Sequence, residues 1–112
     1  VQKGAAAIFT KEGMAQCREN IAYYQKNAKT ISDVLSKKGI RFFGGKNSPY
    51  IWFECPKGMD SWDFFDYLLN NAQVVGTPGA GFGKNGQNFF RLTSFGTHES
   101  TKEAMERFEK LF

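Results

Sequence analysis

The chain has few of the residues that metal sites and disulfide frameworks require. Its 112 residues include two cysteines, Cys17 and Cys55, and one histidine, His98, which are too few for a tetrahedral zinc site. Cys17 falls on a helical apolar stripe and Cys55 ends an apolar run, so both are expected to be buried free thiols. Free thiols of this kind favour the cytoplasm. We expect no metal site, and we expect His98 at the surface or at a helix cap.

Long apolar runs are also absent. No stretch approaches the ~18 consecutive apolar residues of a membrane span, and residues 1–10 do not have the layout of a signal peptide. We therefore expect no contact with a membrane. The chain begins at Val1 instead of an initiator methionine, which suggests that it is a fragment of a longer protein.

Blocks of like charge are missing too. The formal net charge is +4, but the lysines are scattered and only Lys37 and Lys38 are adjacent. Clustered charges, more than their total, are typical of nucleic-acid-binding tails. We therefore interpret the positive charge as a solvated surface and expect no nucleic-acid partner.

Apolar and aromatic residues are plentiful, at 41% and 16% of the chain, which suffices for one domain over residues 1–112. From Met14 to Leu35 apolar residues recur at alternating spacings of three and four, which predicts a helix over residues 11–38, capped by Thr10. Such a helix is about 42 Å long, whereas a globule of this size is ~35 Å wide. One end should project or rest on a part of the protein outside this chain.

The remainder contains four short stretches that are predicted as strands, at residues 40–43, 50–54, 73–75 and 89–95. A second helix should begin at Asp60 or Ser61, and a last helix should open with a capping box of Ser100 and Glu103. Residues 76–88 are predicted as a loop. The order α-β-β-α-β-β-α indicates an α+β (or α/β) fold in which helices cover one face of a small mixed sheet.

The predicted loop contains the pattern G-x-G-x-x-G from Gly81 to Gly86. A dinucleotide site needs a helix directly after this pattern, whereas a strand is predicted here. A Walker A motif fails as well, because Pro78 and Asn85 occupy its first glycine and its Ser/Thr positions. We interpret the segment as a turned loop whose glycines let backbone segments approach closely.

Arg91 is the most informative residue. Strand alternation predicts that Phe90 and Leu92 face one side of the sheet and Arg91 the other. A buried arginine is costly unless it is paired, so one interpretation is a structural ion pair with Glu54 or a nearby aspartate. The other is a carboxylate anchor, because the planar guanidinium binds carboxylates bidentately. The glycine-rich loop just before the strand favours the anchor, since loops of this kind often frame ligands.

Three segments carry a resemblance that extends over nearly the whole chain. They are G-G-K-N-S-P-Y-I-W at residues 44–52, T-P-G-A-G-F-G at 77–83 and F-F-R-L-T-S-F-G at 89–96. Together they resemble the C-terminal segment of fold-type I aminotransferases. The first block and the F-G-x-x-E tail at residues 95–99 are most similar to the LL-diaminopimelate aminotransferase branch.

The resemblance implies that Arg91 binds the α-carboxylate of an amino-acid substrate. It implies a homodimeric full-length enzyme in which pyridoxal phosphate forms an internal aldimine with a lysine of the preceding large domain. That enzyme would transfer amino groups between LL-2,6-diaminopimelate and 2-oxoglutarate in lysine biosynthesis. None of the eleven lysines here matches the family's Schiff-base lysine. As the C-terminal small domain, this chain should hold no catalytic residue, bind no cofactor and be inactive alone.

Asn47 is a second substrate-binding candidate, since its position between two predicted strands suits either a plain turn or an amide that contacts a polar ligand. Other functions also stay open. Residues 81–95 are faintly similar to the aromatic strand of an RNA-binding RRM, although an RRM has the order β-α-β-β-α-β. A stand-alone amino-acid sensor that uses Arg91, or another aminotransferase of the superfamily, would also fit.

Overall fold

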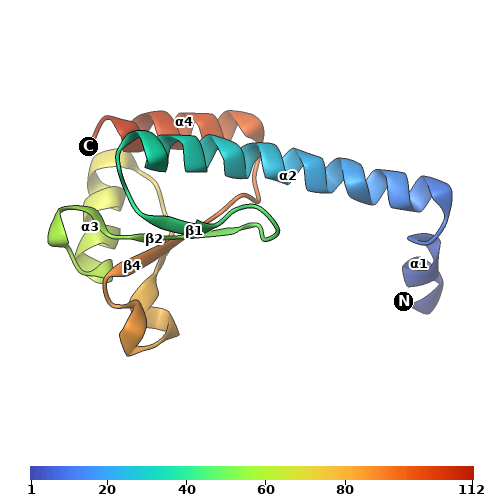
Figure 1. The fold of residues 1–112 in the computed structure, drawn as a ribbon, viewed down its shortest axis with the longest axis horizontal. Coiled ribbons are helices and arrows are strands. Elements are labelled where there is room, and N and C mark those ends of the chain that lie inside the picture. Colours follow the sequence, from blue (N-terminus) through green and yellow to red (C-terminus); the bar gives the residue numbers. More distant parts are fainter.

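The computed structural model describes all 112 residues and contains four α-helices and four strands (Figure 1). In chain order these elements are α1 (Gln2–Ala7), α2 (Lys11–Lys37), β1 (Phe42–Gly44), β2 (Tyr50–Glu54), α3 (Ser61–Ala72), β3 (Thr77–Pro78), β4 (Phe89–Thr93) and α4 (His98–Glu109). Apart from the short α1, the order matches the prediction, and the fold is α+β. No helix is both long enough and apolar enough to cross a membrane.

The four strands form one sheet in the order β1-β2-β4-β3, and every neighbouring pair is antiparallel. The expectation of a mixed sheet is therefore wrong in this detail. Strands β2 and β3 run in the same direction, as a helical crossover through α3 favours. However, β4 lies between them and runs the opposite way, so no parallel pair forms.

The core lies between one face of the sheet and the helices. Strand alternation turns Ile51, Phe53, Phe90 and Leu92 towards the helices, as predicted for β4. Four phenylalanines meet there at ring-centroid distances of 4.9–6.4 Å, mostly edge to face, the favoured geometry for aromatic pairs. They come from two strands of the sheet, β2 and β4, and from the two helices α3 and α4, and are Phe53, Phe90, Phe64 and Phe108.

Helix α2 is buried only along its C-terminal half. Thr10 caps it as predicted, with its hydroxyl oxygen accepting from the Gly13 N–H at 3.0 Å. All of its buried residues lie at or beyond Asn27, whereas Ile21, on the predicted stripe, is 55% exposed. The first half extends away from the sheet, with α1 at its far end, and the molecule measures 49 × 29 × 22 Å (Figure 1). The prediction that one end projects is confirmed.

Two predicted boundaries are wrong for local reasons. Gln73 ends α3 in the left-handed conformation (φ 55°), so the residues after it leave the helix and the strand starts only at Thr77. At α4 the N-cap is Thr97, whose hydroxyl oxygen accepts from the Ser100 N–H at 3.1 Å. The predicted cap, Ser100, therefore lies inside the first turn, and Glu103 pairs with Arg107 instead of closing a capping box.

Candidate functional site

The second face of the sheet is not covered by any helix of the chain (Figure 1). In register across the strands it carries Phe43, Trp52, Arg91 and Thr77. Trp52 stacks on Phe89 at 5.5 Å between ring centroids. This open face is thus aromatic with a single cation near its middle, and it is the surface on which we place the candidate site.

The guanidinium of Arg91 lies between two aromatic rings and has no acidic partner. Its central carbon is 4.4 Å from the centroid of the Tyr50 ring and 4.7 Å from that of Phe82. No carboxylate lies within ion-pair distance of it, and it makes no hydrogen bond. Glu54 pairs with Arg41 instead, Oε2 to Nε, at 3.1 Å. The structural ion pair with Glu54 or a nearby aspartate is therefore wrong, and the donors of the Arg91 guanidinium are free.

The glycine-rich loop carries Phe82 onto this face. It folds into two short 3₁₀ turns, Gly79–Phe82 and Lys84–Gly86. A Cβ on Gly79 would lie 2.2 Å from the Gly86 carbonyl oxygen, and one on Gly86 would lie 2.1 Å from that of Gly79. The two backbone segments can touch only because both residues are glycine. The prediction of close backbone approach is confirmed.

Three amides of the same loop are engaged within its own turns. The N–H groups of Gly83, Gly86 and Gln87 donate to the carbonyls of Ala80, Gly83 and Lys84, at 2.9–3.4 Å. A phosphate cradle needs several N–H groups that converge on one point and have no other partner. The loop therefore acts as a support for Phe82 beside Arg91.

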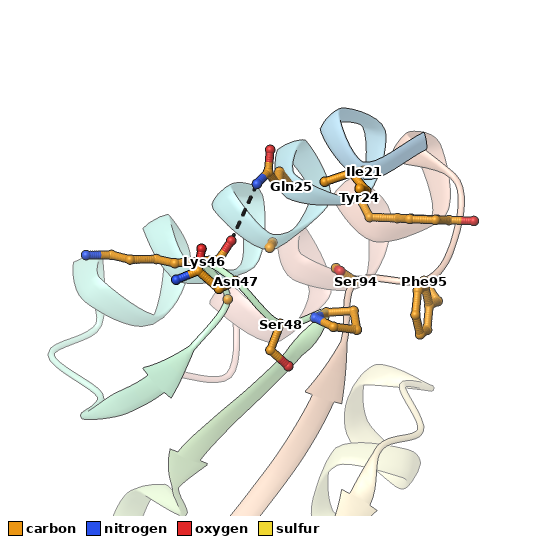
Figure 2. A pocket seen from close by; sticks show the side chains of 11 residues that line it. Ile21, Tyr24, Gln25, Lys46, Asn47, Ser48, Ser94 and Phe95 are labelled. Carbon is orange, nitrogen blue, oxygen red and sulfur yellow. Dashed lines mark hydrogen bonds between the residues drawn. The ribbon is translucent and has the colours of Figure 1, made fainter. Parts of the chain in front are cut away.

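Asn47 lies in a different place, in the turn between β1 and β2. Figure 2 shows it beside α2, at a pocket of about 360 Å³. Its side chain makes no hydrogen bond, whereas Gln25 Nε2 nearby donates to the Lys46 carbonyl at 3.5 Å. Arg91 does not line this pocket. The structure therefore does not bring the two predicted site residues into one cavity.

An aromatic chain connects the pocket with Arg91. Phe95, which lines the pocket, packs edge to face against Tyr24 at 5.0 Å and against Tyr50 at 6.2 Å. Tyr50 in turn lies under Arg91. At the pocket wall the Ser94 hydroxyl is buried and has no hydrogen-bond partner. Asn47 is thus a neighbour of the Arg91 site and not part of it.

The loop between β4 and α4 is tied to α2 through Asn27, which the sequence reasoning missed. This buried amide donates to the carbonyls of Ser94 at 3.0 Å and Gly96 at 2.9 Å. Its Oδ1 is 2.7 Å from His98 Nδ1, and the His98 ring stacks on Tyr23 at 3.7 Å. His98 is therefore a half-buried structural link and does not cap a helix with its side chain. An amide next to an apolar helical stripe was the only signal in the sequence.

Burial raises the pKa of the Cys55 thiol from 9.0 to about 12, with smaller contributions from the charges of Asp60 and Glu54. This thiol lies under the sheet, away from Arg91, so a nucleophilic role is not supported. Cys17 is only half-buried, contrary to prediction, and both cysteines are free. No three potential metal-ligating side chains converge anywhere in the chain.

Neither ring beside Arg91 was singled out from the sequence. Strand alternation places Tyr50 on the same face once the pairing of β2 with β4 is known, because its register partner is Thr93. Nothing local predicts that Phe82 reaches this face, since its position depends on how the glycine-rich loop folds. The clamp around Arg91 is thus visible only in three dimensions.

Residues 1–108 match the family described as aminotransferase class I and II. The chain is 54% identical to the LL-diaminopimelate aminotransferase of Lawsonia intracellularis over 110 residues, and 54% identical to that of Methanosphaera stadtmanae over 111. These matches cover 98% and 99% of the chain but only 27% of each relative, so the chain spans about a quarter of their length.

Solved structures agree with the sequence matches. The L,L-diaminopimelate aminotransferase of Chlamydomonas reinhardtii superposes with a TM-score of 0.90 at 35% identity, over 95% of this chain and 26% of that one. An aromatic aminotransferase from Pyrococcus horikoshii gives a TM-score of 0.86 at 28% identity, over 96% and 29%. These matches favour the aminotransferase interpretation over an RNA-binding module or an isolated sensor. The chain belongs to the class I and II aminotransferase family.

Proposed function

We propose that the chain is the C-terminal small domain of a transaminase in which Arg91 anchors the α-carboxylate of the substrate. The full-length enzyme would transfer an amino group between LL-2,6-diaminopimelate and 2-oxoglutarate in lysine biosynthesis, as a cytoplasmic homodimer. The observation that carries the proposal is the unpaired guanidinium of Arg91 on an uncovered sheet face. The names of relatives that are 54% identical support the choice of substrate.

The environment of Arg91 suits an anion that arrives from outside the chain. A guanidinium stays charged at every physiological pH and offers five donors in a planar fork. Here none of these donors is used inside the chain, and the two neighbouring aromatic side chains contact the guanidinium through their rings without accepting a hydrogen bond from it. Partial exclusion of water by these rings strengthens a charged contact. A substrate carboxylate would therefore complete the coordination of Arg91.

Members of this family use pyridoxal phosphate, but the residues of this chain do not form a site for it. Every lysine is exposed except Lys38, which is half-buried, and three amides of the glycine-rich loop donate to carbonyls of the loop itself. When bound, the cofactor supplies an electron sink for the amino-group transfer. We propose that its lysine and its phosphate site belong to the large domain, and that this chain alone is inactive. Its own contribution is to bind and orient the substrate.

Asn47 is the weaker of the two proposed substrate contacts. Its amide is free of hydrogen bonds, which is consistent with contact to a polar ligand, but it lies at the pocket beside α2 and not beside Arg91. We propose that it contacts the substrate only if part of that molecule extends past Phe95 into the pocket. An Asn47→Ala variant would then raise KM for diaminopimelate while leaving KM for 2-oxoglutarate unchanged.

The decisive experiment measures diaminopimelate:2-oxoglutarate transamination by the full-length protein, with Arg91→Ala and Arg91→Lys variants. Both should lower kcat/KM by about tenfold to a hundredfold, the order of the 1.5–3 kcal/mol of a charged hydrogen bond. Arg41→Ala is the matched control, because Arg41 is exposed and paired with Glu54; it should keep wild-type kinetics.

Two other outcomes would each correct a different part of the proposal. If the Arg91 variants lose stability but keep wild-type activity per folded molecule, Arg91 is structural and the anchor assignment is wrong. If the wild-type enzyme does not transaminate diaminopimelate but acts on another amino acid, the substrate assignment is wrong while the role of Arg91 can stand.

A further inference from the structure

Arg91 is held from two sides by parts of the chain that are distant in sequence. Tyr50 begins β2, on the strand next to Arg91, and Phe82 ends the first turn of the glycine-rich loop. Their ring centroids lie 4.4 and 4.7 Å from the guanidinium carbon, well inside the ~6 Å limit of a cation–π contact. Two such contacts on one cation restrict where its charge can lie.

The contacts restrain the cation without consuming its donors. Each ring attracts the positive charge through its π electrons, and neither forms a hydrogen bond with the guanidinium. An acidic partner would restrain Arg91 as well, but it would occupy the N–H groups that a bidentate carboxylate needs. Aromatic neighbours therefore combine a fixed cation with a free donor fork.

The two rings are themselves supported. Phe82 packs edge to face on Trp52 at 5.7 Å, and Trp52 is the register partner of Arg91. Tyr50 packs on Phe95, and its carbonyl accepts from the Gly45 N–H at 3.1 Å. Yet Tyr50 is 41% and Phe82 is 56% exposed. Because neither belongs to the buried core, their substitution is not expected to unfold the protein.

We propose that Tyr50 and Phe82 are positioning residues that hold the Arg91 guanidinium ready for the substrate carboxylate. This proposal rests on the proposed role of Arg91 as the anchor. Preorganisation of this kind lowers the entropic cost of binding, because a long arginine side chain no longer has to be ordered when the substrate arrives. Loss of either ring should weaken carboxylate binding without removing the anchor.

The test compares full-length variants Tyr50→Leu and Phe82→Leu with the conservative Tyr50→Phe and Phe82→Tyr. Each leucine should raise KM for both diaminopimelate and 2-oxoglutarate by about twofold to fivefold, the effect expected from one exposed cation–π contact, with little change in kcat. The aromatic replacements should restore wild-type KM. Phe43→Leu is the matched control, because Phe43 is an exposed phenylalanine on the same face with no contact to Arg91.

The same leucine variants in an Arg91→Ala background separate the two proposals. If the rings act through Arg91, they should have no further effect on KM there. Equal effects with and without Arg91 would mean that the rings touch the substrate themselves, and the positioning role would be wrong. If Arg91→Ala lowers kcat/KM but the leucine variants match Phe43→Leu, only the clamp is wrong. If Arg91→Ala changes nothing, the anchor assignment fails and the clamp with it.

Discussion

The two faces of the sheet are built from the same strands, but their side chains differ in burial and in the contacts that they make within the chain. On the covered face Phe53 and Phe90 are fully buried among the helices. The residues next to them on the two strands, Trp52 and Arg91, face outwards, and Arg91 lies between two aromatic rings. The side chains of the covered face are fully packed within the chain, whereas the Arg91 guanidinium has no anionic partner and is free to bind one.

This difference separates the residues that hold the fold from those that are free for binding. Close packing leaves core residues little tolerance for change. The open face has no such constraint, because its side chains are partly solvated and lie away from the core cluster. An unpaired arginine on such a face is better explained by a ligand than by stability, because its guanidinium donors have no acceptor within the chain.

The largest expected effect on stability comes from a substitution on the covered face of the sheet. Phe90→Ala should lower the free energy of unfolding by about 3–5 kcal/mol, because it removes a ring that packs against Phe53 and Phe64 and leaves a cavity. Phe43→Ala, on the open face, should cost less than about 1 kcal/mol. Urea denaturation of the 112-residue chain measures both, and equal losses would contradict the division between the faces.

A smaller effect is expected at Asn27, where a covering helix holds the loop that follows β4. Asn27→Ala removes the donors to the Ser94 and Gly96 carbonyls and leaves buried acceptors without partners, which should cost about 1–3 kcal/mol. Gln25→Ala, at an exposed amide two residues earlier on the same helix, is the control and should change little. A loss below that of the control would show that water replaces the Asn27 amide.

Much of this division follows from the sequence, because strand alternation is local. The alternation placed Phe90 and Leu92 opposite Arg91, and the three–four spacing predicted the long helix to within one residue at its C-terminal end. The family resemblance supplied the proposed role of Arg91. These inferences depend on patterns within a few residues, which neighbouring elements do not override here.

What could not be predicted depends on contacts between distant segments. The antiparallel order needs β4 to insert between β2 and β3, and no local pattern encodes which neighbour a strand will choose. Phe82 reaches Arg91 only because the loop is folded by the contact of Gly79 with Gly86. Asn27 meets a loop 67 residues further along the chain. Single-sequence periodicity carries no information about such pairings.

A further test concerns the N-cap of α4, where the chain passes from the sheet to a helix that covers it. Thr97→Ala should destabilise the chain by about 1 kcal/mol, the usual cost of losing an N-cap side chain. Ser100→Ala, at the position that the sequence pattern favours, should cost only a few tenths of a kcal/mol, because Ser100 already lies inside the helix. Thermal unfolding of the two variants can be followed by circular dichroism. If Ser100→Ala lowered the free energy of unfolding more than Thr97→Ala, Thr97 would not be the cap.

The smallest expected effect is a pH dependence of stability that comes from the buried Cys55 thiol. Because the pKa of the Cys55 thiol rises from 9.0 to about 12 in the fold, the unfolded chain releases this proton first as the pH increases. Stability therefore falls above pH 9, and full stability is present below it. At pH 9 the loss should be roughly a few tenths of a kcal/mol relative to pH 7.

Cys55→Ala should lose this dependence while Cys17→Ala retains it, since titration of other groups is common to both variants. Identical pH profiles for the two variants would mean that the Cys55 thiol is reached by solvent, and that the covered face is less tightly closed than its packing indicates.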